Sequence, residues 1–363
     1  MRKQRHIYFF LPNFSIGGAG NSIFNICESI KNKSDKLSVI SIGQNHYKKN
    51  FKKIGVNVIE IFTNKTIFGI IKIYKMMSII SKKNNIIFVS NINYANVLCS
   101  IFLVKIKNLK LILVERTPLQ ELEIYFNFCD FFKKKIIYIL AKMFYAKADF
   151  IIGNSLNVSS YIKSKFKINV STINPIIKIK KIKKKIYNKK FNLTWIGRNS
   201  IEKNLVDFSK SIDLIKNKNF KINIVSNKDV KDNIKKIVSN ENFKKISFFN
   251  FKNDRKFMDK IYYETDIYIS TSIYEGFPNT IVEAITFECL IISSKSHGGL
   301  MEIIKNNKFG LLYKTHNYIE LSKRINFAIN NFNRCRSKII KAKDNLINKS
   351  LQNNRYKKFF NSI

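Results

Sequence analysis

Two glutamates eight positions apart stand in the stretch SIYEGFPNTIVEAITFE, residues 272–288. Glu275 precedes a Gly-Phe-Pro turn, and Glu283 lies within the apolar run 281–285. Carboxylates are rarely buried without a partner, so Glu283 requires one. Ribose hydroxyls can donate to a carboxylate, and we expect Glu283 to accept from the ribose of a nucleotide. The alternatives are a solvated acidic face, which the apolar flanks oppose, and an internal partner such as Lys203.

The helix that carries the second glutamate is expected to begin at Pro278, because proline suits a first helical turn, and to run to about residue 288. Its first amides, at Asn279 and Thr280, would then point N–H groups at phosphate oxygens. At 1.5 Å per residue, the second glutamate follows about 7 Å further along the helix. Glu275 lies in the loop before the helix and can accept from sugar hydroxyls beyond the diphosphate.

A second candidate site is the loop WIGRNSIEKNL, residues 195–205. Arg198 ends a predicted strand, and Lys203 follows five residues later near a helix start. Two cations at a strand end beside a helix N-terminus can hold a diphosphate. Lys203 taken alone could be an ordinary surface cation in a lysine-rich chain. Arginine is sparse in this sequence, which makes Arg198 the stronger candidate.

A glycine cluster, NFSIGGAGNSIFN, follows the first predicted strand. Gly17, Gly18 and Gly20 allow a sharp turn and close approach of the backbone to a ligand. A helix is expected to begin near Asn21 or Ser22 and to point its amides into the same space. The cluster lacks the complete dinucleotide fingerprint and the Lys-Ser/Thr of a P-loop, so a plain tight turn stays open.

Strand-like and helix-like segments alternate along the whole chain. Near-continuous apolar strands separated by helices are typical of parallel sheets covered on both faces. The sequence therefore predicts an α/β protein with two tandem doubly wound, Rossmann-like domains that face each other across a cleft. Expected strands are 6–12, 36–43, 56–62, 85–91, 110–116 and 148–155, then 191–198, 220–227, 245–251, 266–272, 289–296 and 309–314, and expected helices include 22–32, 66–83, 206–218 and 317–332.

The best domain boundary is the segment NPIIKIKKIKKKIYNKK, residues 174–190, which contains little besides isoleucine and lysine. A charge run of this kind is typical of a solvated linker. We therefore predict a first domain over 1–173, a basic linker over 174–190 and a second domain over 191–345. Residues 346–363 are expected to form a C-terminal helix that could pack back on the first domain.

Several motifs resemble retaining glycosyltransferase family 4, a group of GT-B enzymes (glycosyl transferases group 1). They are EGFPNTIVEA, SSKSHGGLMEII and FGLLY, together with GRNSIEKN, GGAGNSIFNI and INPI. The resemblance covers most of the chain and is most specific across 190–313. It implies a nucleotide-sugar donor on the second domain, an acceptor on the first, transfer with retention of anomeric configuration, and no metal.

By the same resemblance, Arg198 and Lys203 contact the donor diphosphate and Glu283 the ribose. Glu275 contacts the donor sugar, and Gly18 lets the backbone approach that sugar and its phosphate. We take Arg198, Lys203 and Glu275 as catalytic. Substrate contacts are also assigned to Gly17, Gly276, Phe277, Asn279, Thr280 and, more weakly, His297 in the SHGG loop.

The sequence departs from this family in one place. Many members have a histidine after a first-domain strand, near the reacting centre, whereas this chain reads LVERTP. Glu115 and Arg116 stand there instead. Either one contacts donor or acceptor, or the site is rearranged.

The net charge of +42 has two explanations. It could serve anionic substrates, a membrane or nucleic acid, or it could reflect a compositional bias, since most of the excess is lysine. Nucleic-acid binding would need clustered basic residues beside exposed aromatics or a known reading module, and neither is evident. The segment 131–150 combines a basic cluster with an apolar stripe. It could lie on an anionic membrane or be a crossover helix packed on the first sheet.

The resemblance thus implies a retaining, metal-independent glycosyltransferase, of hexosyl or N-acetylhexosaminyl groups, in bacterial surface polysaccharide synthesis. Its partners would be a nucleotide sugar and a glycan or lipid-linked glycan acceptor, with no nucleic acid. No Asp-x-Asp motif is present to hold a divalent ion. We expect a cytoplasmic protein, with peripheral contact at the inner face of the membrane left open. The other possibilities are a GT-B nucleotide-sugar epimerase and, less favoured, a basic nucleic-acid-binding protein.

Overall fold

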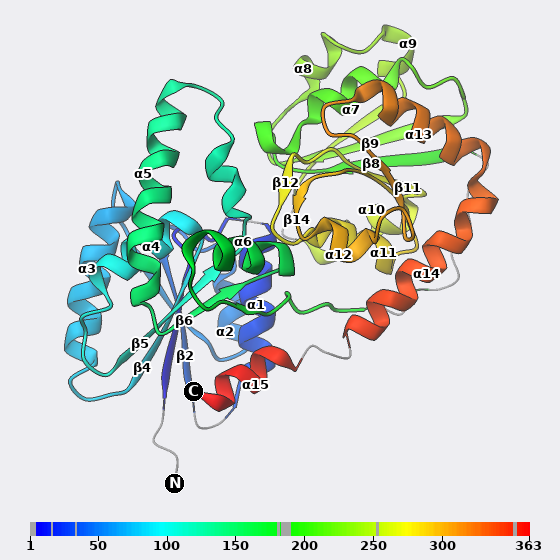
Figure 1. Cartoon of the computed structure of the whole chain (residues 1–363). Coiled ribbons are helices and arrows are strands. Elements are labelled where there is room, and N and C mark those ends of the chain that lie inside the picture. The colour runs from blue at the N-terminus through cyan, green and yellow to red at the C-terminus, as the bar shows by residue number, and fades with distance from the viewer. Residues whose placement is uncertain are drawn as a thin grey trace. The chain divides into compact units, whose positions relative to one another are not determined.

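The computed structural model describes residues 5–15, 17–32, 35–179, 182, 190–251, 254–350 and 354–363. The chain divides into two compact units (Figure 1). The first unit comprises residues 1–176 together with 353–363, and the second comprises 177–352. Each unit is built on one parallel sheet with helices on both faces, which confirms the prediction of two doubly wound domains.

The first unit contains a sheet that, among the described residues, has seven strands in the order β3-β2-β1-β4-β5-β6-β7. Strand β1 pairs in parallel with both β2 and β4, so the chain order reverses beside it. All six strands expected in this half are present, and the two-residue β7 was not predicted. The strands are β1 (His6–Phe10), β2 (Lys36–Ile42), β3 (Asn57–Ile61), β4 (Ile86–Asn91), β5 (Leu109–Glu115), β6 (Phe150–Gly153) and β7 (Ser171–Thr172).

Helices cover both faces of this sheet because its strands carry apolar side chains on both sides. One core lies under α3 (Thr66–Ile80), α4 (Asn93–Phe102), α5 (Phe128–Phe144) and α6 (Leu156–Phe166). The other lies under α1 (Gly18–Ile30), α2 (Lys48–Lys53) and α15 (Arg355–Ser362). The C-terminal helix α15 buries Tyr356 and Phe360 in that second core, beside strand β1.

The second unit repeats this arrangement with a sheet in the order β10-β9-β8-β11-β13-β15. Strand β8 pairs in parallel with β9 and β11, so the reversal point lies between β8 and β11. A separate short pair, β12 (Tyr274–Glu275) with β14 (His297–Gly298), was not predicted. The main strands are β8 (Phe191–Ile196), β9 (Phe220–Ser226), β10 (Ile246–Asn250), β11 (Ile267–Ser270), β13 (Leu290–Ser294) and β15 (Leu311–Tyr313).

Two cores also flank the second sheet, and α14 contributes to both. One core includes residues of α7 (Leu205–Ile212), α8 (Lys231–Lys235) and α13 (Tyr318–Asn330). The other includes residues of α10 (Arg255–Glu264), α11 (Asn279–Thr286) and α12 (Leu300–Ile304). The remaining helices are α9 (Asn240–Phe243) and α14 (Phe332–Ser350).

Several predicted boundaries were wrong. Helix α1 begins at Gly18, three residues before the expected Asn21, so the glycine cluster is the first turn of the helix. Helix α11 ends at Thr286, because Glu288 adopts a left-handed conformation (φ 57°) that terminates the helix. Helix α7 ends at Ile212, well short of the predicted residue 218.

Two further segments bear on the predicted domain limits and membrane contact. Of the predicted linker 174–190, residues 180, 181 and 183–189 lie outside the described part of the chain. The segment 131–150 forms most of α5, which connects β5 to β6 and also leaves several apolar side chains exposed. Within the described ranges, no helix is both long and apolar enough to cross a membrane.

Candidate active site

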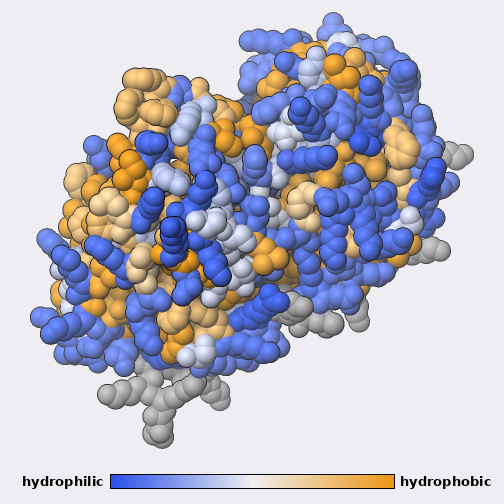
Figure 2. Space-filling view, viewed as in Figure 1, coloured by the Kyte–Doolittle hydropathy of each residue, from blue (hydrophilic) through white to orange (hydrophobic). Residues whose placement is uncertain are grey.

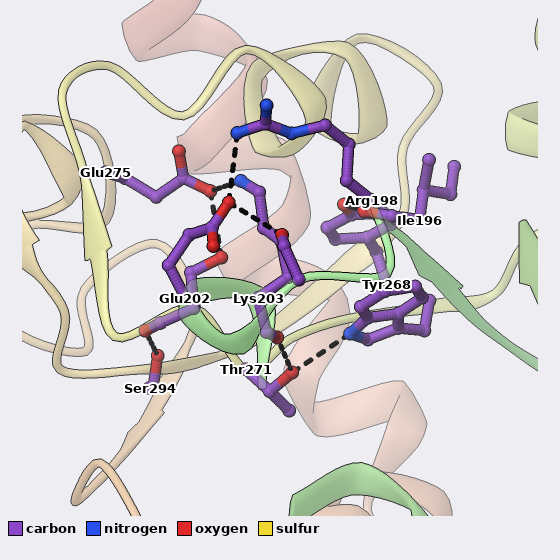
Figure 3. A network of polar contacts seen from close by, with 11 residues as sticks. Ile196, Arg198, Glu202, Lys203, Tyr268, Thr271, Glu275 and Ser294 are labelled. Carbon is purple, nitrogen blue, oxygen red and sulfur yellow. Dashed lines mark hydrogen bonds and ion pairs between the residues drawn. The ribbon is translucent and has the colours of Figure 1, made fainter. Parts of the chain in front are cut away.

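The candidate site of the second unit lies where the strand order reverses. Strands β8 and β11 are neighbours there, and their carboxyl ends lead into the loops 197–204 and 271–278. In open α/β sheets, ligands bind outside the carboxyl ends of the strands at such a reversal point. The sheet therefore brings the Arg198 loop and the Glu275 loop to one edge (Figure 3).

Lys203 and Glu275 form an ion pair that joins these two loops. The Lys203 ammonium donates to Glu275 Oε1, and the Ser272 hydroxyl donates to the same oxygen at 2.9 Å (Figure 3). The two side chains are 20% and 16% exposed, so they are largely shielded yet still reachable. A cation and a carboxylate are thus held side by side at the strand ends.

A hydrogen-bonded chain fixes the backbone around this pair. Trp195 Nε1 donates to the Thr271 hydroxyl at 2.9 Å, and that hydroxyl donates to the Lys203 carbonyl at 2.7 Å (Figure 3). Trp195 also explains why residue 197 is a glycine, because a Cβ at this position would lie 2.6 Å from the indole ring. Buried groups of two adjacent strands therefore set the position of the Lys203 turn.

Arg198 extends from the end of β8 into solvent, and its side chain is 64% exposed. Its Nη2 donates to Glu202 Oε1 at 2.9 Å, and the Ser200 hydroxyl donates to the same oxygen at 2.6 Å. Glu202 was quoted in the motif but not assigned a role. Its spacing of four residues from Arg198 is the signal that could have identified it as the partner that orients the guanidinium.

Glu283 has partners within the second unit. Its Oε1 accepts from Arg255 Nη1 at 2.8 Å, and its Oε2 accepts from the Tyr262 hydroxyl at 2.9 Å. The alternative of an internal partner is therefore confirmed, but the partners are Arg255 and Tyr262. The suggested Lys203 is wrong, because it pairs with Glu275. The Glu283 side chain remains 23% exposed, and a carboxylate has about four lone-pair sites, so further hydroxyl donors can still be accepted.

Arg255 and Tyr262 are the functional candidates that sequence reasoning missed. Burial disfavours the charged Arg255, but the Glu283 and Asp259 carboxylates outweigh it and raise the pKa of Arg255. Burial, and then the Glu283 charge, raise the pKa of Tyr262 well above its usual value. Both groups thus fix the orientation of the Glu283 side chain. Only the scarcity of arginine could have drawn attention to Arg255.

The first turn of α11 is less open than expected. No side chain caps it at Pro278, but the Asn279 amide donates to the Phe277 carbonyl at 2.9 Å. Phe277 is buried among apolar residues of the core. Gly276 is buried too, and its carbonyl accepts from the Gly299 amide at 3.0 Å. The half-buried Thr280 is the better placed of the two predicted residues to offer its amide to a ligand.

The short ladder β12–β14 brings the SHGG loop to the Glu275 loop. Tyr274 lies opposite His297 and Glu275 opposite Gly298 in register. The His297 side chain is exposed, and its amide donates to the Ile273 carbonyl at 3.2 Å. His297 therefore lies beside the candidate site, as its assignment as a weak donor contact requires.

In the first unit, the glycine loop is held by Tyr47. The Tyr47 hydroxyl accepts from the Gly17 amide at 3.2 Å and donates to the Gly17 carbonyl at 3.0 Å. A Cβ on Gly20 would lie 2.6 Å from the Tyr47 ring, which explains that glycine. Gly17 and Gly18 are exposed at the start of α1, which no side chain caps. The loop can therefore be approached closely from solvent.

The structure separates the roles of Glu115 and Arg116. Adjacent residues at a strand end point to opposite faces of a sheet. Glu115 points toward α4 and α5, where Oε1 accepts from Asn96 Nδ2 at 2.7 Å and from the Tyr145 hydroxyl. Burial raises the pKa of Glu115 to about 8. Arg116 points toward α1, where Nη1 donates to the Ser22 hydroxyl at 2.8 Å.

The predicted residues therefore form one group in each unit. In the second unit, the reversal point and its flanking loops bring together Arg198, Lys203, Glu275, Gly276, Phe277, Asn279, Thr280, Glu283 and His297. In the first unit, Gly17, Gly18 and Arg116 surround the start of α1, and Glu115 lies on the opposite face. Among the described residues, no three His, Cys, Asp or Glu side chains cluster closely enough to hold a metal ion.

Comparison with known proteins finds relatives that share the family motifs and the fold of this chain. Residues 177–345 match the family described as glycosyl transferases group 1. A curated relative from Campylobacter jejuni is 25% identical over 340 residues, covering 90% of this chain and 89% of the relative. Its name is GalNAc-alpha-(1->4)-GalNAc-alpha-(1->3)-diNAcBac-PP-undecaprenol alpha-1,4-N-acetyl-D-galactosaminyltransferase.

Solved structures share the fold over almost the whole chain. Alr3699/HepE of Anabaena, in complex with UDP and glucose, has a TM-score of 0.79 at 16% identity and 98% coverage of both chains. Sucrose-phosphate synthase of Thermosynechococcus elongatus has a TM-score of 0.81 at 14% identity, covering 99% of this chain and 100% of that one. These neighbours have the GT-B fold. The chain is accordingly a glycosyltransferase with the GT-B fold, and its second unit matches the model of glycosyl transferases group 1.

Proposed function

We propose that the chain moves a sugar, with retention of anomeric configuration, from a nucleoside-diphosphate sugar to a glycan or lipid-linked glycan. The observation that carries this proposal is the Lys203–Glu275 pair beside Arg198, at the carboxyl ends of β8 and β11. Two cations match a diphosphate, and a neighbouring carboxylate matches sugar hydroxyls. Retention rests on the resemblance to a retaining family.

In this proposal each candidate site residue of the second unit contacts a particular part of the donor. Glu283 accepts from the ribose hydroxyls, and Arg255 and Tyr262 hold that side chain in its orientation. Arg198 and Lys203 contact the diphosphate. Glu275 accepts from hydroxyls of the transferred sugar. The bond between the anomeric carbon and the phosphate oxygen breaks, and a bond from that carbon to the acceptor hydroxyl oxygen forms. The hydroxyl proton passes to the leaving nucleoside diphosphate.

The leaving nucleoside diphosphate gains negative charge as this bond breaks. We propose that fixed cations neutralise it, without a divalent ion. Lys203 is already held by Glu275, and Arg198 by Glu202, so neither has far to move as charge develops. Preorganised donors of this kind stabilise a transition state more than mobile ones do.

An apolar surface on the first unit supports a lipid-linked acceptor. Large apolar side chains of α5 are exposed, among them Phe128 at 76%, Ile136 at 55% and Met143 at 60%. Helix α3 adds Phe68 and Ile79, and Figure 2 shows apolar side chains gathered over this part of the first unit. Lysines 133, 135 and 142 are exposed on α5 as well. A surface with both features suits peripheral contact with an anionic membrane.

The relatives suggest where to look for substrates. The C. jejuni relative is named for a glycan on PP-undecaprenol, and the Anabaena structure holds UDP and glucose. We therefore propose a UDP-sugar as the first donor to test and an undecaprenol-diphosphate-linked glycan as the first acceptor. Such transfer would serve the synthesis of a bacterial surface polysaccharide.

A screen of nucleotide sugars tests the proposal. Purified protein is mixed with UDP-glucose, UDP-galactose, UDP-GlcNAc, UDP-GalNAc and guanosine and thymidine analogues, and thermal stabilisation and slow release of the nucleotide are measured. One donor should raise the unfolding temperature and be hydrolysed slowly. Loss of both responses in an Arg198→Ala, Lys203→Ala variant would locate them at this site. A product that is an epimerised sugar with no transfer would favour the epimerase instead.

A further inference from the structure

Among the residues that the structure describes, Arg116 is a buried cation without a carboxylate partner. Its side chain follows β5, and the residue is only 8% exposed. Nε donates to Asn91 Oδ1 at 2.8 Å and Nη1 donates to the Ser22 hydroxyl at 2.8 Å. Both partners are neutral. Within the described part of the chain, Nη2 is buried and donates to no atom.

Such an arrangement is costly in a folded protein. An ionised group loses hydration when buried, and the loss is offset only by an opposite charge or by a complete set of hydrogen bonds. Burial accordingly lowers the pKa of Arg116. The Tyr356 phenol on α15 acts in the opposite direction, but burial raises its own pKa and so favours the uncharged form. Arg5 in the same unit shows the usual solution, since its guanidinium is paired with Asp35 at 2.7 Å.

The environment of Arg116 is organised to keep the guanidinium in place. Asn91 ends β4, and its Nδ2 donates to the Phe10 carbonyl of β1 at 3.0 Å, so its Oδ1 must face Arg116 Nε. These two strands flank the reversal point of the first sheet, where ligands of α/β sheets bind. Glu115 cannot compensate the charge, because it points to the opposite face.

The start of α1 completes the site. Ser22, which accepts from Arg116, lies in the second turn of this helix. The helix has 13 residues, no side chain caps it at Gly17, and no acidic residue lies in its first turn. The amides of that turn and the helix dipole therefore favour an anion at the same place.

We propose that Arg116 and the first turn of α1 bind a phosphoryl group of one of the two substrates. The guanidinium then gains the anionic partner that the fold lacks, through the Nη2 that the protein leaves unused. Arginine suits this task because its planar fork matches phosphate oxygens. This inference rests on the proposed function, because both a nucleotide-sugar donor and a lipid-diphosphate acceptor carry such a group.

Inorganic pyrophosphate is the probe for the first experiment. All proteins carry Arg198→Ala and Lys203→Ala, so that the second unit does not contribute. Calorimetric titration then compares this parent with proteins that also carry Arg116→Gln, Arg116→Lys or Arg5→Gln. Arg116→Gln should weaken pyrophosphate binding at least about tenfold, Arg116→Lys by less, and Arg5→Gln not at all. Equal affinity in the parent and Arg116→Gln would overturn the proposal.

The unfolding temperature distinguishes a binding role of Arg116 from a purely structural role. Arg116→Gln removes an uncompensated buried charge, so its unfolding temperature should stay level or rise, whereas Arg5→Gln should unfold at a lower temperature. A clear loss of stability in Arg116→Gln with unchanged pyrophosphate affinity would make Arg116 a structural residue. Should Arg116→Gln fail to fold, Arg116→Lys gives the binding comparison alone.

Kinetics of proteins with Arg198 and Lys203 intact identify whether Arg116 binds the phosphoryl group of the donor or that of the acceptor. An increase of tenfold or more in KM for donor hydrolysis without acceptor, in Arg116→Gln, would assign the group to the donor. Unchanged donor hydrolysis with a raised KM for the lipid-diphosphate acceptor would assign it to the acceptor. The pyrophosphate titration needs no turnover, so an inactive wild-type protein would count against the proposed function and not against this site.

Discussion

Lys203 and Glu275 lie 72 residues apart and form an ion pair that joins the loop after β8 to the loop after β11. Each neutralises the other before any donor binds, so the site carries no uncompensated charge at this point. A diphosphate and a sugar can then be accepted by small shifts of two groups already in position. The ion pair thus places a cation next to a carboxylate. This arrangement suits a ligand in which a negatively charged group adjoins a group rich in hydroxyls.

Replacing Arg198 should impair turnover strongly. Arg198→Ala is expected to lower kcat about a hundredfold or more, the scale seen on losing one preorganised donor at a developing charge. Arg198→Lys should rescue poorly, since an ammonium cannot reproduce a planar fork. Steady-state kinetics with the donor found by the screen measure both effects.

Arg324→Ala is the matched control, because Arg324 on α13 also pairs with a glutamate four residues away, Glu320. It should leave kcat within about twofold, since a surface pair of this kind contributes roughly 0–1 kcal/mol to stability alone. Equal activity losses in Arg198→Ala and Arg324→Ala would show that Arg198 has no special place in the reaction.

Glu283→Ala should weaken donor binding, and it should also cost some stability because Arg255 and the Tyr262 hydroxyl lose a partner. Leaving buried ribose hydroxyls without their acceptor costs on the order of 1–3 kcal/mol, which is roughly a 5- to 150-fold rise in Kd. Calorimetry with the nucleoside diphosphate measures this change. Glu288→Ala is the control, because Glu288 follows the same helix and pairs with Lys343 at 2.6 Å. An unaltered Kd in folded Glu283→Ala would remove the ribose assignment.

The fold could be predicted from the sequence because its signal is local. Each buried parallel strand is a short apolar run, and each turn between elements breaks that run, so the alternation is visible without any tertiary contact. The loops with Arg198, Lys203 and Glu275, and the helix with Glu283, could likewise be chosen as candidates because each is a continuous stretch placed after a predicted strand.

The parts that could not be predicted depend on contacts between distant residues. Arg255 lies 28 positions before Glu283, and nothing in either stretch indicates the other. The early start of α1 depends on Tyr47, 30 positions beyond Gly17, which holds the turn through its hydroxyl. Likewise, the opposite orientations of Glu115 and Arg116 became clear only once the helices on each face were known.

Glu115 should make the stability of the protein depend on pH. Its folded pKa is raised to about 8 by burial, so above the unfolded value near 4.5 the folded state binds more protons than the unfolded state. Stability must therefore fall as pH rises from about 4.5 to 8, by up to about 1.4 kcal/mol per pH unit for this group.

Glu115→Gln tests this dependence, because its amide oxygen can still accept from Asn96 and Tyr145 while its charge never changes. Unfolding temperatures of both proteins are compared between pH 5 and 8.5. The unfolding temperature of Glu115→Gln should increase steadily relative to that of the wild type as pH rises through this range. The difference should become constant above pH 8. A constant difference at every pH would mean that Glu115 is ionised in the folded protein.

Removing divalent ions should leave sugar transfer intact. Fixed cations and a helix N-terminus are expected to neutralise the leaving diphosphate, so activity in excess EDTA should equal that with added magnesium. Initial rates with the donor found by the screen provide the measurement. Activity that disappears in EDTA and returns with magnesium or manganese would defeat the proposed mechanism of leaving-group stabilisation.

The exposed apolar face of α5 should bind anionic membranes. Wild-type protein is expected to sediment with vesicles of phosphatidylglycerol and phosphatidylcholine, less with phosphatidylcholine alone, and less again at high salt, because salt screens the lysines. Phe128→Ser with Phe132→Ser should weaken binding at least about tenfold, since burying each phenylalanine contributes roughly 1.5–3 kcal/mol. A dye on Cys129, which is exposed while the other cysteines are buried, reports the contact directly.

A matched control separates apolar contact from general attraction of a basic protein to an anionic surface. Ile319 on α13 is 50% exposed, close to the 49% of Phe132, but belongs to the second unit. Ile319→Ser should bind vesicles as the wild type does, because it leaves both the charge and the α5 face unchanged. If the two phenylalanine replacements and Ile319→Ser gave the same affinity, the attraction would come from charge alone, and α5 would have no part in placing a lipid-linked acceptor.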